Sequence, residues 1–486
     1  MTTTSESAVL TQDRALYIAG EWLPAADGAT FTVGDPGNDE TLALVADASP
    51  ADGLAAVAAA DEAAAGWAAT APRERGEVLR RAFDLMRSRR EELARLITRE
   101  NGKALAEGRG EVDYAAEFLR WFSEEACRGL GTLGISPDGS RRMLTELRPV
   151  GTSLFVTPWN FPAAMATRKI GPALAAGCTV VLKPAAETPL TAYAMAEIFA
   201  EAGAPPGVVN VVTTTASSKV VGAMMADPRV RKISFTGSTE VGRVLLRQAA
   251  DRVLRCSMEL GGNAPFLVLE DADIERSVAS AMVAKLRNGG QSCTAANRFY
   301  VHRSRAEEFT ERFAAAMAGT KVGYGLDEGV DMGAMISHAA AADVARIVDS
   351  SVAAGAQLVT GGGVLDGPGA YYAPTVLAEV PADAPCLQEE IFGPVAPVVV
   401  FDDDDEAIAL ANDTEFGLVA FVQSRELTRA LRVADRLEAG MVGINRGVVS
   451  DPAAPFGGVK QSGLGREGAH DGLLEFLETK YVAASW

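Results

Sequence analysis

Histidine and cysteine are scarce in this sequence. Three histidines occur among its 486 residues, namely His302, His338 and His470. Five cysteines occur, none of them in a CxxC pair, namely Cys127, Cys178, Cys256, Cys293 and Cys386. These counts exclude a disulfide framework and a zinc site and suit a reducing compartment. We therefore expect no metal site and, if the protein is an enzyme, a catalytic base other than histidine.

Long apolar runs and an excess of basic residues are also missing. The longest uncharged stretch, residues 149–167, contains three prolines, whereas a membrane helix needs about 20 mainly apolar residues. The 45 Lys and Arg residues stand against 64 Asp and Glu, so the formal net charge is −19. This charge disfavours nucleic acid and anionic membranes as partners. Residues 1–14 show no basic start followed by an apolar core, so we expect a cytoplasmic protein without a secretory signal.

Apolar runs at regular spacing predict an α/β fold. They begin at Ser153, Thr179, Val208 and Lys232, with helix-compatible segments between them. This spacing fits right-handed βαβ crossovers in a parallel sheet. The runs do not alternate between apolar and polar residues, so both faces of the sheet should be buried.

Other predicted elements surround this sheet. Residues 15–24 are typical of a short hairpin that turns near Gly20, and residues 50–127 carry helical periodicity with a stop at Asn101-Gly102. A second α/β series begins near residue 260. Its strands are expected in the segments FLVL, RFYVHRS, APVVVF, GLVAFVQS and MVGIN, and its helices over 272–288 and 306–320.

The acidic run at residues 402–406 allows two interpretations. Five carboxylates in a row could bind a metal ion. They could instead begin a helix over about 405–412, where the helix dipole and solvent favour acidic side chains. We favour the helix, because runs of like charge are usually solvated.

Cys293 differs from the other cysteines. It follows a loop that contains Gly289 and Gly290, and this loop comes just after a helical pattern that ends near Leu286. Adjacent glycines let a ligand approach the backbone closely, and a cysteine in such a loop can present its sulfur and its amide together. Cys293 is therefore a candidate nucleophile, although a lone cysteine can also be a small core hydrophobe.

Three further motifs carry polar groups suited to chemistry. Glu259 precedes a glycine pair at a strand end, where it could act as a base or bind a neighbouring amide. Asn160 lies in the apolar turn TPWNFP, where its side chain could donate to an oxyanion or satisfy the turn backbone. Residues 235–242, FTGSTEVG, form a glycine turn between a strand and a helix whose first amides can hold a phosphate.

Together these four motifs, in this order and at these spacings, resemble the aldehyde dehydrogenase superfamily. Further matches are Lys183-Pro184, EIFGP from Glu390 and PFGG from Pro455. The resemblance covers nearly the whole chain. It implies an α/β fold with a Rossmann-like cofactor domain, an α/β catalytic domain and a small β oligomerisation element, assembled as a homodimer or homotetramer.

The resemblance also implies the boundaries of these parts. The cofactor-binding domain would comprise residues 1–131 and 150–259, and the catalytic domain residues 260–467. The oligomerisation element would comprise residues 132–149 and 468–486, with a protruding hairpin that turns at Pro137-Asp138-Gly139.

The resemblance assigns catalytic roles to three residues. Cys293 would be the nucleophile, Glu259 the general base, and Asn160 the oxyanion-binding amide together with the backbone N–H of Cys293. Addition of a thiolate to an aldehyde creates an oxyanion that needs fixed donors. Loss of hydride then leaves a thioester, which a carboxylate can hydrolyse by activating water.

The cofactor implied by the resemblance is NAD or NADP. Lys183 would contact a cofactor ribose, Gly237 and Ser238 the pyrophosphate, and Glu390 and Phe392 the nicotinamide ribose. The full set of implied cofactor-binding residues is Trp159, Lys183, Ala186, Gly237, Ser238, Gly242, Leu260, Glu390 and Phe392.

Residues 163–169, 411–418 and 443–450 are most similar to succinate-semialdehyde dehydrogenases. In that subfamily two arginines and a serine bind the distal carboxylate of the substrate, which here implies Arg168, Arg287 and Ser450, with Phe456 beside them. Either arginine could instead pair with a structural carboxylate or with helix-end carbonyls. Glutarate semialdehyde, one methylene longer, is the alternative substrate, since one methylene is worth only about 1–3 kcal/mol. Another aliphatic or aromatic aldehyde is also possible.

The sequence departs from the family pattern at two positions. Many relatives in the subfamily carry a second cysteine two residues after the nucleophile, and here that residue is Ala295, so a disulfide switch is absent. Relatives that prefer NAD often carry a Glu three residues after the lysine, where this chain has Ala186 and then Glu187. A 2′-phosphate would meet less repulsion there, so we slightly favour NADP.

Two other classes of protein remain open from the motifs alone. A thiol hydrolase or acyltransferase would use Cys293 without a cofactor. A cofactor-binding scaffold would have lost catalysis, although the presence of Cys293, Glu259 and Asn160 argues against it.

Overall fold

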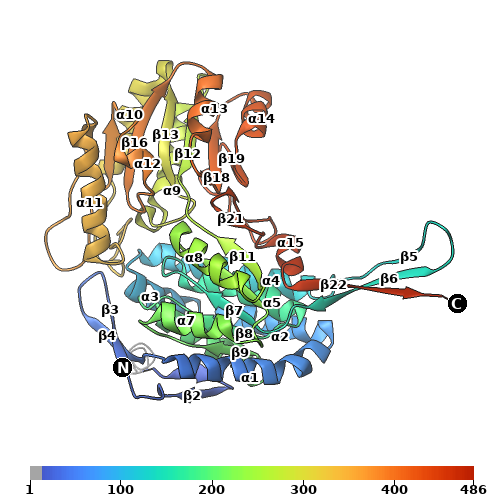
Figure 1. Ribbon diagram of the computed structural model, residues 1–486. Coiled ribbons are helices and arrows are strands. Elements are labelled where there is room, and N and C mark those ends of the chain that lie inside the picture. Colours follow the sequence, from blue (N-terminus) through green and yellow to red (C-terminus); the bar gives the residue numbers. More distant parts are fainter. Residues whose placement is uncertain (1–13, 486) are drawn as a thin grey trace.

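The computed structural model describes residues 14–485. It contains two α/β bodies, each built on one large sheet, and an arm that carries the C-terminus away from them (Figure 1). Residues 1–13, whose composition argues against a secretory signal, lie outside the described residues. Within residues 14–485, no helix combines the length and the hydropathy that crossing a membrane requires.

The first sheet has eight strands in the order β2-β1-β9-β8-β7-β10-β11-β21. Its five central strands run parallel, and the four predicted from apolar runs are confirmed as β7 to β10. The predicted hairpin is confirmed too, with Ala19 and Gly20 at positive φ in its two-residue turn. The strands are β1 (Leu16–Ile18), β2 (Glu21–Leu23), β7 (Ser153–Val156), β8 (Val180–Lys183), β9 (Val209–Val211), β10 (Lys232–Thr236), β11 (Arg255–Glu259) and β21 (Gly463–Leu464).

Helices cover both faces of this sheet. The predicted stop at Asn101-Gly102 is confirmed, because α3 ends at Asn101 and Gly102 adopts φ 92°. The helices are α1 (Pro50–Ala69), α2 (Pro72–Ser88), α3 (Arg90–Asn101), α4 (Leu105–Glu125), α5 (Pro162–Ala176), α6 (Pro189–Glu201), α7 (Ser217–Ala226), α8 (Thr239–Ala250) and α15 (Ala469–Leu474). A separate hairpin joins β3 (Thr30–Gly34) to β4 (Thr41–Ala46).

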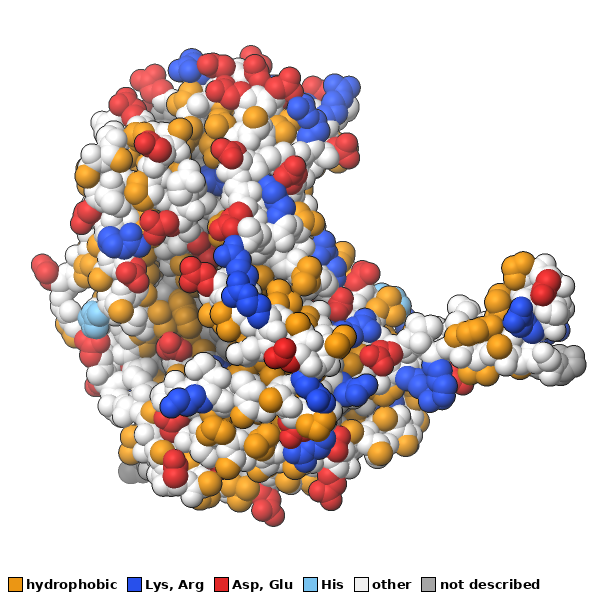
Figure 2. Space-filling model, viewed as in Figure 1, with side chains coloured by type: hydrophobic (Ala, Val, Ile, Leu, Met, Phe, Trp, Pro, Cys, Tyr) orange, Lys and Arg blue, Asp and Glu red, His pale blue; other side chains and the backbone are white. Residues whose placement is uncertain are grey.

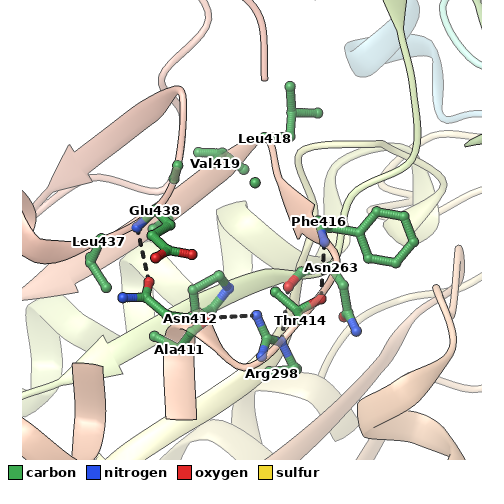
Figure 3. A pocket seen from close by; sticks show the side chains of 14 residues that line it. Asn263, Arg298, Ala411, Asn412, Thr414, Phe416, Leu418, Val419, Leu437 and Glu438 are labelled. Carbon is green, nitrogen blue, oxygen red and sulfur yellow. Dashed lines mark hydrogen bonds between the residues drawn. The ribbon is translucent and has the colours of Figure 1, made fainter. Parts of the chain in front are cut away.

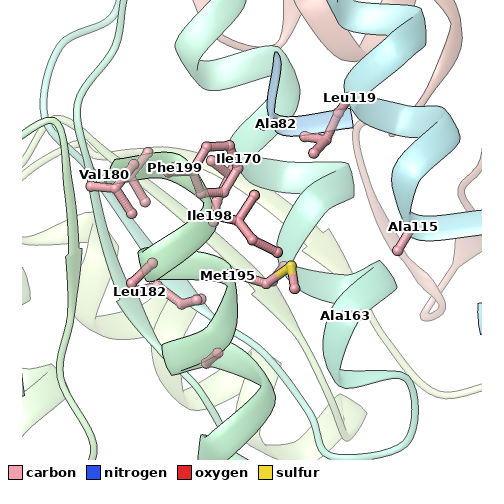
Figure 4. Packing of buried hydrophobic residues seen from close by; sticks show 14 of the residues in the cluster. Ala82, Ala115, Leu119, Ala163, Ile170, Val180, Leu182, Met195, Ile198 and Phe199 are labelled. Atoms are coloured by element: carbon pink, nitrogen blue, oxygen red, sulfur yellow. The ribbon is translucent and has the colours of Figure 1, made fainter. Parts of the chain in front are cut away.

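The main core of this body lies between the sheet and helices α4, α5 and α6. Ile170 of α5 and Phe199 of α6 pack with Leu182 of β8, and all three are buried (Figure 4). Full burial of such a side chain contributes about 1.5–3 kcal/mol. This packing fixes the carboxyl ends of the parallel strands, which is where open α/β sheets bind their ligands.

The chain passes from the first sheet to the second through four residues, Leu260–Asn263, between β11 and β12. The second sheet has the order β14-β15-β16-β13-β12-β18-β19 and is parallel except for β14. The five predicted strands are confirmed as β12, β13, β16, β18 and β19; β14 and β15 were not predicted. The strands are β12 (Ala264–Val268), β13 (Ala296–His302), β14 (Gln357–Thr360), β15 (Thr375–Ala378), β16 (Val395–Phe401), β18 (Val419–Gln423) and β19 (Met441–Ile444), with a small pair β17 (Phe416–Gly417) and β20 (Val459–Lys460) nearby.

The helices of the second body differ from the predicted ones in detail. The helix predicted over 306–320 begins three residues earlier, since the His302 side chain accepts from Ser304 N and caps it. The helix predicted over 272–288 ends at Leu286, where η1 begins, and α11 was not predicted. The helices are α9 (Ile274–Leu286), η1 (Arg287–Gly290), α10 (Arg303–Ala318), α11 (His338–Ala353), α12 (Pro385–Gln388), α13 (Asp404–Asn412) and α14 (Leu427–Arg436).

The acidic run forms the N-cap and the first turn of α13, as the helix interpretation predicted. Asp403 is the N-cap and accepts from Glu406 N at 2.9 Å, while Asp404 forms an ion pair with Arg429 at 2.7 Å. In the part of the chain that the structure describes, no group of three or more His, Cys, Asp or Glu side chains is placed to hold a metal ion.

The arm is an antiparallel sheet of three strands, β5 (Leu133–Ile135), β6 (Arg142–Pro149) and β22 (Leu477–Ala484). Apolar side chains cover much of its surface (Figure 2), and Leu133 and Ile135 are 68% and 54% exposed.

The C-terminal boundaries predicted from the sequence need correction. Residues 463–464 pair with β11, although they were assigned to the catalytic domain. Residues 469–474, assigned to the oligomerisation element, form α15, which packs on α4 and α5. Residues 463–464 belong to the first body through their backbone pairing with β11, and α15 belongs to it because Leu473 and Leu474 pack in or against its core. Only β22 therefore joins the arm.

Candidate active site

Cys293 follows a tight backbone turn between α9 and β13. Asn288, Gly289 and Gly290 all have positive φ, between 52° and 77°. A side chain at residue 290 would place its Cβ 2.1 Å from the carbonyl oxygen of Gly393, so only glycine fits there. The glycine loop before Cys293 is therefore packed tightly against the backbone at Gly393, about 100 residues later in the chain.

A cavity of about 240 Å³ reaches from the N-terminus of α8 to Cys293. It lies between the two bodies, where the surface is hollowed (Figure 2). Both bodies contribute to its wall. The predicted site residues that line it are Trp159, Asn160, Gly237, Ser238, Leu260, Cys293, Glu390 and Phe392.

The side chain of Asn160 is oriented by the loop of Cys293. Its Nδ2 donates to the carbonyl of Gln291 at 3.1 Å, and its Oδ1 finds no hydrogen-bond partner within residues 14–485. The backbone carbonyl of Asn160 accepts from Asn288 Nδ2 at 2.9 Å. The predicted oxyanion amide and the predicted nucleophile thus belong to one hydrogen-bonded unit.

Glu259 is buried at the end of β11, close to a second buried carboxylate, Glu467. Burial raises the pKa of Glu259 well above its ordinary value, and the charge of Glu467 raises it further. Its Oε2 has no hydrogen-bond partner in the described chain. A buried carboxyl with a raised pKa and a free oxygen is suited to accept a proton from water.

Glu467 is a site residue that the sequence did not predict. Lys169 Nζ lies 2.5 Å from its Oε1 and Arg168 Nε 2.8 Å from its Oε2. These cations hold the pKa of Glu467 below its ordinary value against the opposing effect of burial. No local motif marks Glu467, because its partners lie about 300 residues earlier in the chain.

The thiol of Cys293 is neutral at physiological pH in this environment. Burial raises its pKa to about 12, and Glu390 and Glu259 add to the effect while Arg168 and Arg287 oppose it. Formation of the thiolate therefore requires a proton acceptor or a change in the local charges.

The turn before α8 has the form expected of a phosphate site. Ser238 is the N-cap of α8, and its Oγ accepts from Val241 N. Gly242 lies against Leu260, where a Cβ would come within 2.4 Å of Leu260 Cδ2. Thr236, at the end of β10, has a buried hydroxyl without a partner among the described residues. An orphaned hydroxyl beside a helix N-terminus fits a bound dinucleotide.

Glu390 and Phe392 also line this cavity. Glu390 Oε1 accepts from Gly262 N at 3.2 Å, and burial raises its pKa to about 7. Phe392 has φ 47° and packs edge-on against Trp159 at a centroid distance of 5.5 Å. The cavity wall thus combines a titratable carboxyl with two aromatic rings.

Lys183 and Ala186 lie outside the lining of this cavity. Lys183 is buried at the end of β8, where its Nζ donates to Ser217 Oγ at 2.9 Å and burial lowers its pKa to about 8. Ala186 and the exposed Glu187 line a second cavity, of about 460 Å³. A buried ammonium bound to a hydroxyl also fits the anionic part of a dinucleotide.

The four predicted substrate residues have different surroundings. Arg168 is buried, paired with Glu467, and its guanidinium lies 3.9 Å from the ring centroid of Phe456. Arg287 lies over the rings of Phe161 and Tyr114, and no carboxylate within residues 14–485 is in ion-pair distance of it. Ser450 is half-buried in the loop after β19 and is not part of the cavity wall.

Residues 411–418 lie around a much smaller cavity, of about 10 Å³ (Figure 3). The buried Arg298 donates Nη2 to the carbonyl of Ala411 at 3.0 Å and Nε to that of Asn263 at 2.9 Å. This segment therefore supports the crossing at residues 260–263.

Comparison with known proteins identifies the family. The aldehyde dehydrogenase family model matches residues 22–482. The chain is 55% identical to the succinate-semialdehyde dehydrogenase of Paenarthrobacter nicotinovorans, over 91% of this chain and 98% of that protein. It is 47% identical to the glutarate-semialdehyde dehydrogenase of Pseudomonas putida, over 96% and 97%. It is 46% identical to the NADP(+) succinate-semialdehyde dehydrogenase of Escherichia coli, over 96% of each chain.

Solved structures share the fold. The succinate-semialdehyde dehydrogenase of Burkholderia pseudomallei superposes with a TM-score of 0.97 at 45% identity, covering all of both chains. An aldehyde dehydrogenase of Bacillus cereus in complex with NAD⁺ gives the same TM-score at 35% identity, covering 100% of this chain and 99% of that one. The chain therefore belongs to the aldehyde dehydrogenase family, whose members oxidise aldehydes with NAD or NADP.

Proposed function

We propose that this dehydrogenase oxidises succinate semialdehyde to succinate through a covalent intermediate on Cys293. The observation that carries the substrate assignment is the guanidinium of Arg287, which lies over the rings of Phe161 and Tyr114 and has no carboxylate in ion-pair distance among the described residues. Its fixed donors match a carboxylate. Arg168, buried beside Phe456, would be the second cation. The relatives named for succinate and glutarate semialdehydes support the same substrate class.

In the first chemical step Cys293, which is partly exposed, loses its proton to solvent, and the thiolate sulfur then adds to the aldehyde carbon. The π bond of the carbonyl breaks, and its electron pair leaves a negative charge on the oxygen. The oxyanion that forms would accept hydrogen bonds from Asn160 Nδ2 and from the backbone N–H of Cys293. Fixed donors of this kind contribute most when the site is closed to water. When bound, NAD(P)⁺ accepts the hydride that leaves the tetrahedral carbon.

The residues proposed to hold the cofactor are those that line the cavity from α8 to Cys293, together with Lys183. The Ser238 turn would bind phosphate, and Glu390 and Phe392 would contact the nicotinamide end. Support comes from the orphaned Thr236 hydroxyl and from the buried Lys183 ammonium.

Glu259 would complete turnover by activating water for attack on the thioester. Its free Oε2 can accept the proton, and its raised pKa makes it a stronger base than an exposed carboxylate. Glu467, Lys169 and Arg168 set the electrostatic environment in which that proton is held.

Glu259→Gln should leave the first turnover intact and abolish the next ones. We expect a burst of reduced cofactor equal to the enzyme concentration, followed by a steady state about 10²–10⁴-fold slower than wild type. Rapid-mixing absorbance measurements test this. Loss of the burst itself would contradict the assignment of Glu259 to thioester hydrolysis.

The pH dependence of thioester hydrolysis should shift when the negative charge of Glu467 is removed. Glu259 acts as a carboxylate, so the hydrolysis rate falls as the pH drops through its raised pKa. Glu467→Gln removes a negative charge and frees two cations, both of which lower the Glu259 pKa. The acidic limb of the pH–rate profile should therefore move to lower pH; a limb that moves to higher pH or stays in place would contradict this coupling.

The carboxylate-binding role is tested most cleanly at Arg287, since Arg168 is already paired with Glu467. Arg287→Met should raise KM for succinate semialdehyde about 10- to 100-fold, because a charge-assisted hydrogen bond is lost. Butanal, which lacks the carboxylate, should be affected little. Arg276→Met, on the exposed side of α9, is the control. Equal effects on both aldehydes would contradict the role.

Glutarate semialdehyde is the second candidate substrate. A relative of 47% identity carries that name, and one methylene changes binding by only about 1–3 kcal/mol. The ratio of kcat/KM for the two semialdehydes decides between them.

NADP is the cofactor that we favour. Lys183 and Ser217 offer an ammonium and a hydroxyl close together, and Ala186 adds no negative charge beside them. A 2′-phosphate would be attracted by the ammonium and would meet no acidic side chain at residue 186.

Ala186→Glu should reverse the cofactor preference. The new carboxylate would repel a 2′-phosphate and accept from ribose hydroxyls, so the NADP/NAD ratio of kcat/KM should fall at least about 10-fold. Steady-state assays with both cofactors measure this, with Glu21→Gln as the control because that side chain is exposed and lines neither cavity. An unchanged ratio would place the ribose elsewhere.

The arm would join two copies of the chain into a homodimer, or two dimers into a tetramer. Its exposed Leu133 and Ile135 support this, because contiguous exposed apolar side chains usually mark an interface. We also propose a cytoplasmic location, which suits five cysteines without a disulfide among the described residues.

Replacing both Leu133 and Ile135 by Asp should yield a monomer. Light scattering after size-exclusion chromatography should give the chain mass of 50.8 kDa, whereas the wild type should give a multiple of it. Leu427→Asp with Leu431→Asp, at 61% and 53% exposure on α14, is the matched control and should not change the mass. An unchanged mass for the arm variant would exclude the arm as the interface.

A further inference from the structure

A buried ion pair lies directly behind the turn that carries Asn160. Lys103, in the loop before α4, and Glu111, in the second turn of α4, are 1% and 2% exposed, and Lys103 Nζ lies 2.6 Å from Glu111 Oε2. Burying two charges is costly unless both are fully hydrogen-bonded. The partners of this pair are therefore informative about what it does.

Lys103 binds the backbone of the Asn160 turn. Its Nζ donates to the carbonyl of Asn160 at 2.8 Å, and it lies 4.1 Å from the ring centroid of Phe161. Two of its three donors are thus satisfied by Glu111 and Asn160, and the aromatic face lies beside the ammonium.

Glu111 binds the backbone that follows the same turn. Its Oε1 accepts from Ala163 N at 2.9 Å and from Ala164 N at 3.3 Å. These are among the first amides of α5, which begins at Pro162 and has no side-chain cap of its own. The carboxylate therefore replaces the missing cap and fixes where α5 begins.

The same stretch of chain also binds the loop of Cys293. Glu107 Oε1 accepts from Asn288 N at 2.6 Å, and Asn288 Nδ2 donates to the Asn160 carbonyl at 2.9 Å. Asn101 Nδ2 donates to the carbonyl of Trp159 at 3.0 Å. Residues 101–111 thus connect the two loops that would supply the oxyanion donors.

We propose that Lys103, held by Glu111, is a positioning residue that fixes the oxyanion-binding amide of Asn160 relative to Cys293. The side chain of Asn160 is itself held by one hydrogen bond, from Nδ2 to Gln291. Its direction therefore depends on the backbone carbonyl that Lys103 and Asn288 bind. The proposal rests on the role given to Asn160 above.

A double-mutant cycle between Lys103→Met and Asn160→Ala tests the proposal. Asn160→Ala should slow the first-turnover formation of reduced cofactor about 10²–10³-fold, as loss of an oxyanion donor does. Lys103→Met alone should slow it about 10- to 100-fold through misplacement of that donor, with the KM for cofactor unchanged. In the Asn160→Ala background, Lys103→Met should cost less than about 3-fold.

The outcomes separate this inference from the proposed function. If Asn160→Ala has no effect, the role of Asn160 is wrong and the positioning role is overturned with it. If Asn160→Ala slows the step but Lys103→Met costs the same factor in both backgrounds, only the positioning role is overturned, because a general structural defect is additive.

Two further variants separate a positioning effect from a general loss of folding stability. Lys103→Met combined with Glu111→Gln removes both buried charges while leaving an amide oxygen for the first amides of α5, and it should show the same non-additivity with Asn160→Ala. Arg75→Met is the matched control: Arg75 is also a buried cation that donates to backbone carbonyls, of Ala175 and Thr70, at the opposite end of α5. It should lower the melting temperature and leave the first-turnover rate unchanged; a rate loss equal to that of Lys103→Met would overturn the proposal.

Discussion

The close contact between the crossing at Leu260–Asn263 and the loop of Cys293 is the constraint on which the site depends. A Cβ at residue 262 would lie 2.3 Å from the Cys293 carbonyl oxygen, so the two backbones touch through a glycine. Three hydrogen bonds join the same four residues to two other segments, from Ser462 Oγ to Gly261 O, and to residues 387–390 from Gly262 N to Glu390 and from Asn263 Nδ2 to Leu387 O. The loop of Cys293 and the carboxylate of Glu390 are therefore held against one short piece of chain that directly follows Glu259 and links the sheets.

Features that depend on local sequence were predictable, and those that depend on distant partners were not. Buried parallel strands, the glycine turn before α8 and the loop of Cys293 each follow from adjacent residues, and the structure has them where the sequence indicated. Glu467 and Lys103 carry no local signal, because the partners that link them to the site, Lys169 and Asn160, lie 298 and 57 residues away in the chain. The C-terminal boundary was misplaced for the same reason, since β21 belongs to the first sheet only through its pairing with β11.

The net charge of the protein is negative, whereas several cations lie buried in and around the site. A net charge of −19 provides no long-range attraction for an anionic substrate or cofactor. Inside, Arg168, Lys169, Lys183 and Lys103 are all nine-tenths or more buried, so their fields are screened little by salt. Three of them are partly neutralised by Glu467 or Glu111. Under the proposed function, binding of the anionic substrate and cofactor would therefore depend on a few internal cations whose positions the fold fixes.

The site combines glycines that are packed against other backbone segments with side chains that are proposed to bind the substrate. This difference affects how the aldehyde specificity of such a protein can change. Positions 262, 290 and 463 admit only glycine, because a Cβ there would come within 2.3 Å of a backbone carbonyl oxygen. Substitution at these positions would displace the backbone of the site, whereas exchange of Arg287 or Ser450 would, under the proposed function, change only the surroundings of the distal carboxylate of the substrate. New aldehyde specificities can therefore arise by replacing a few side chains at one rim, while the thiol, its donors and its base are inherited unchanged.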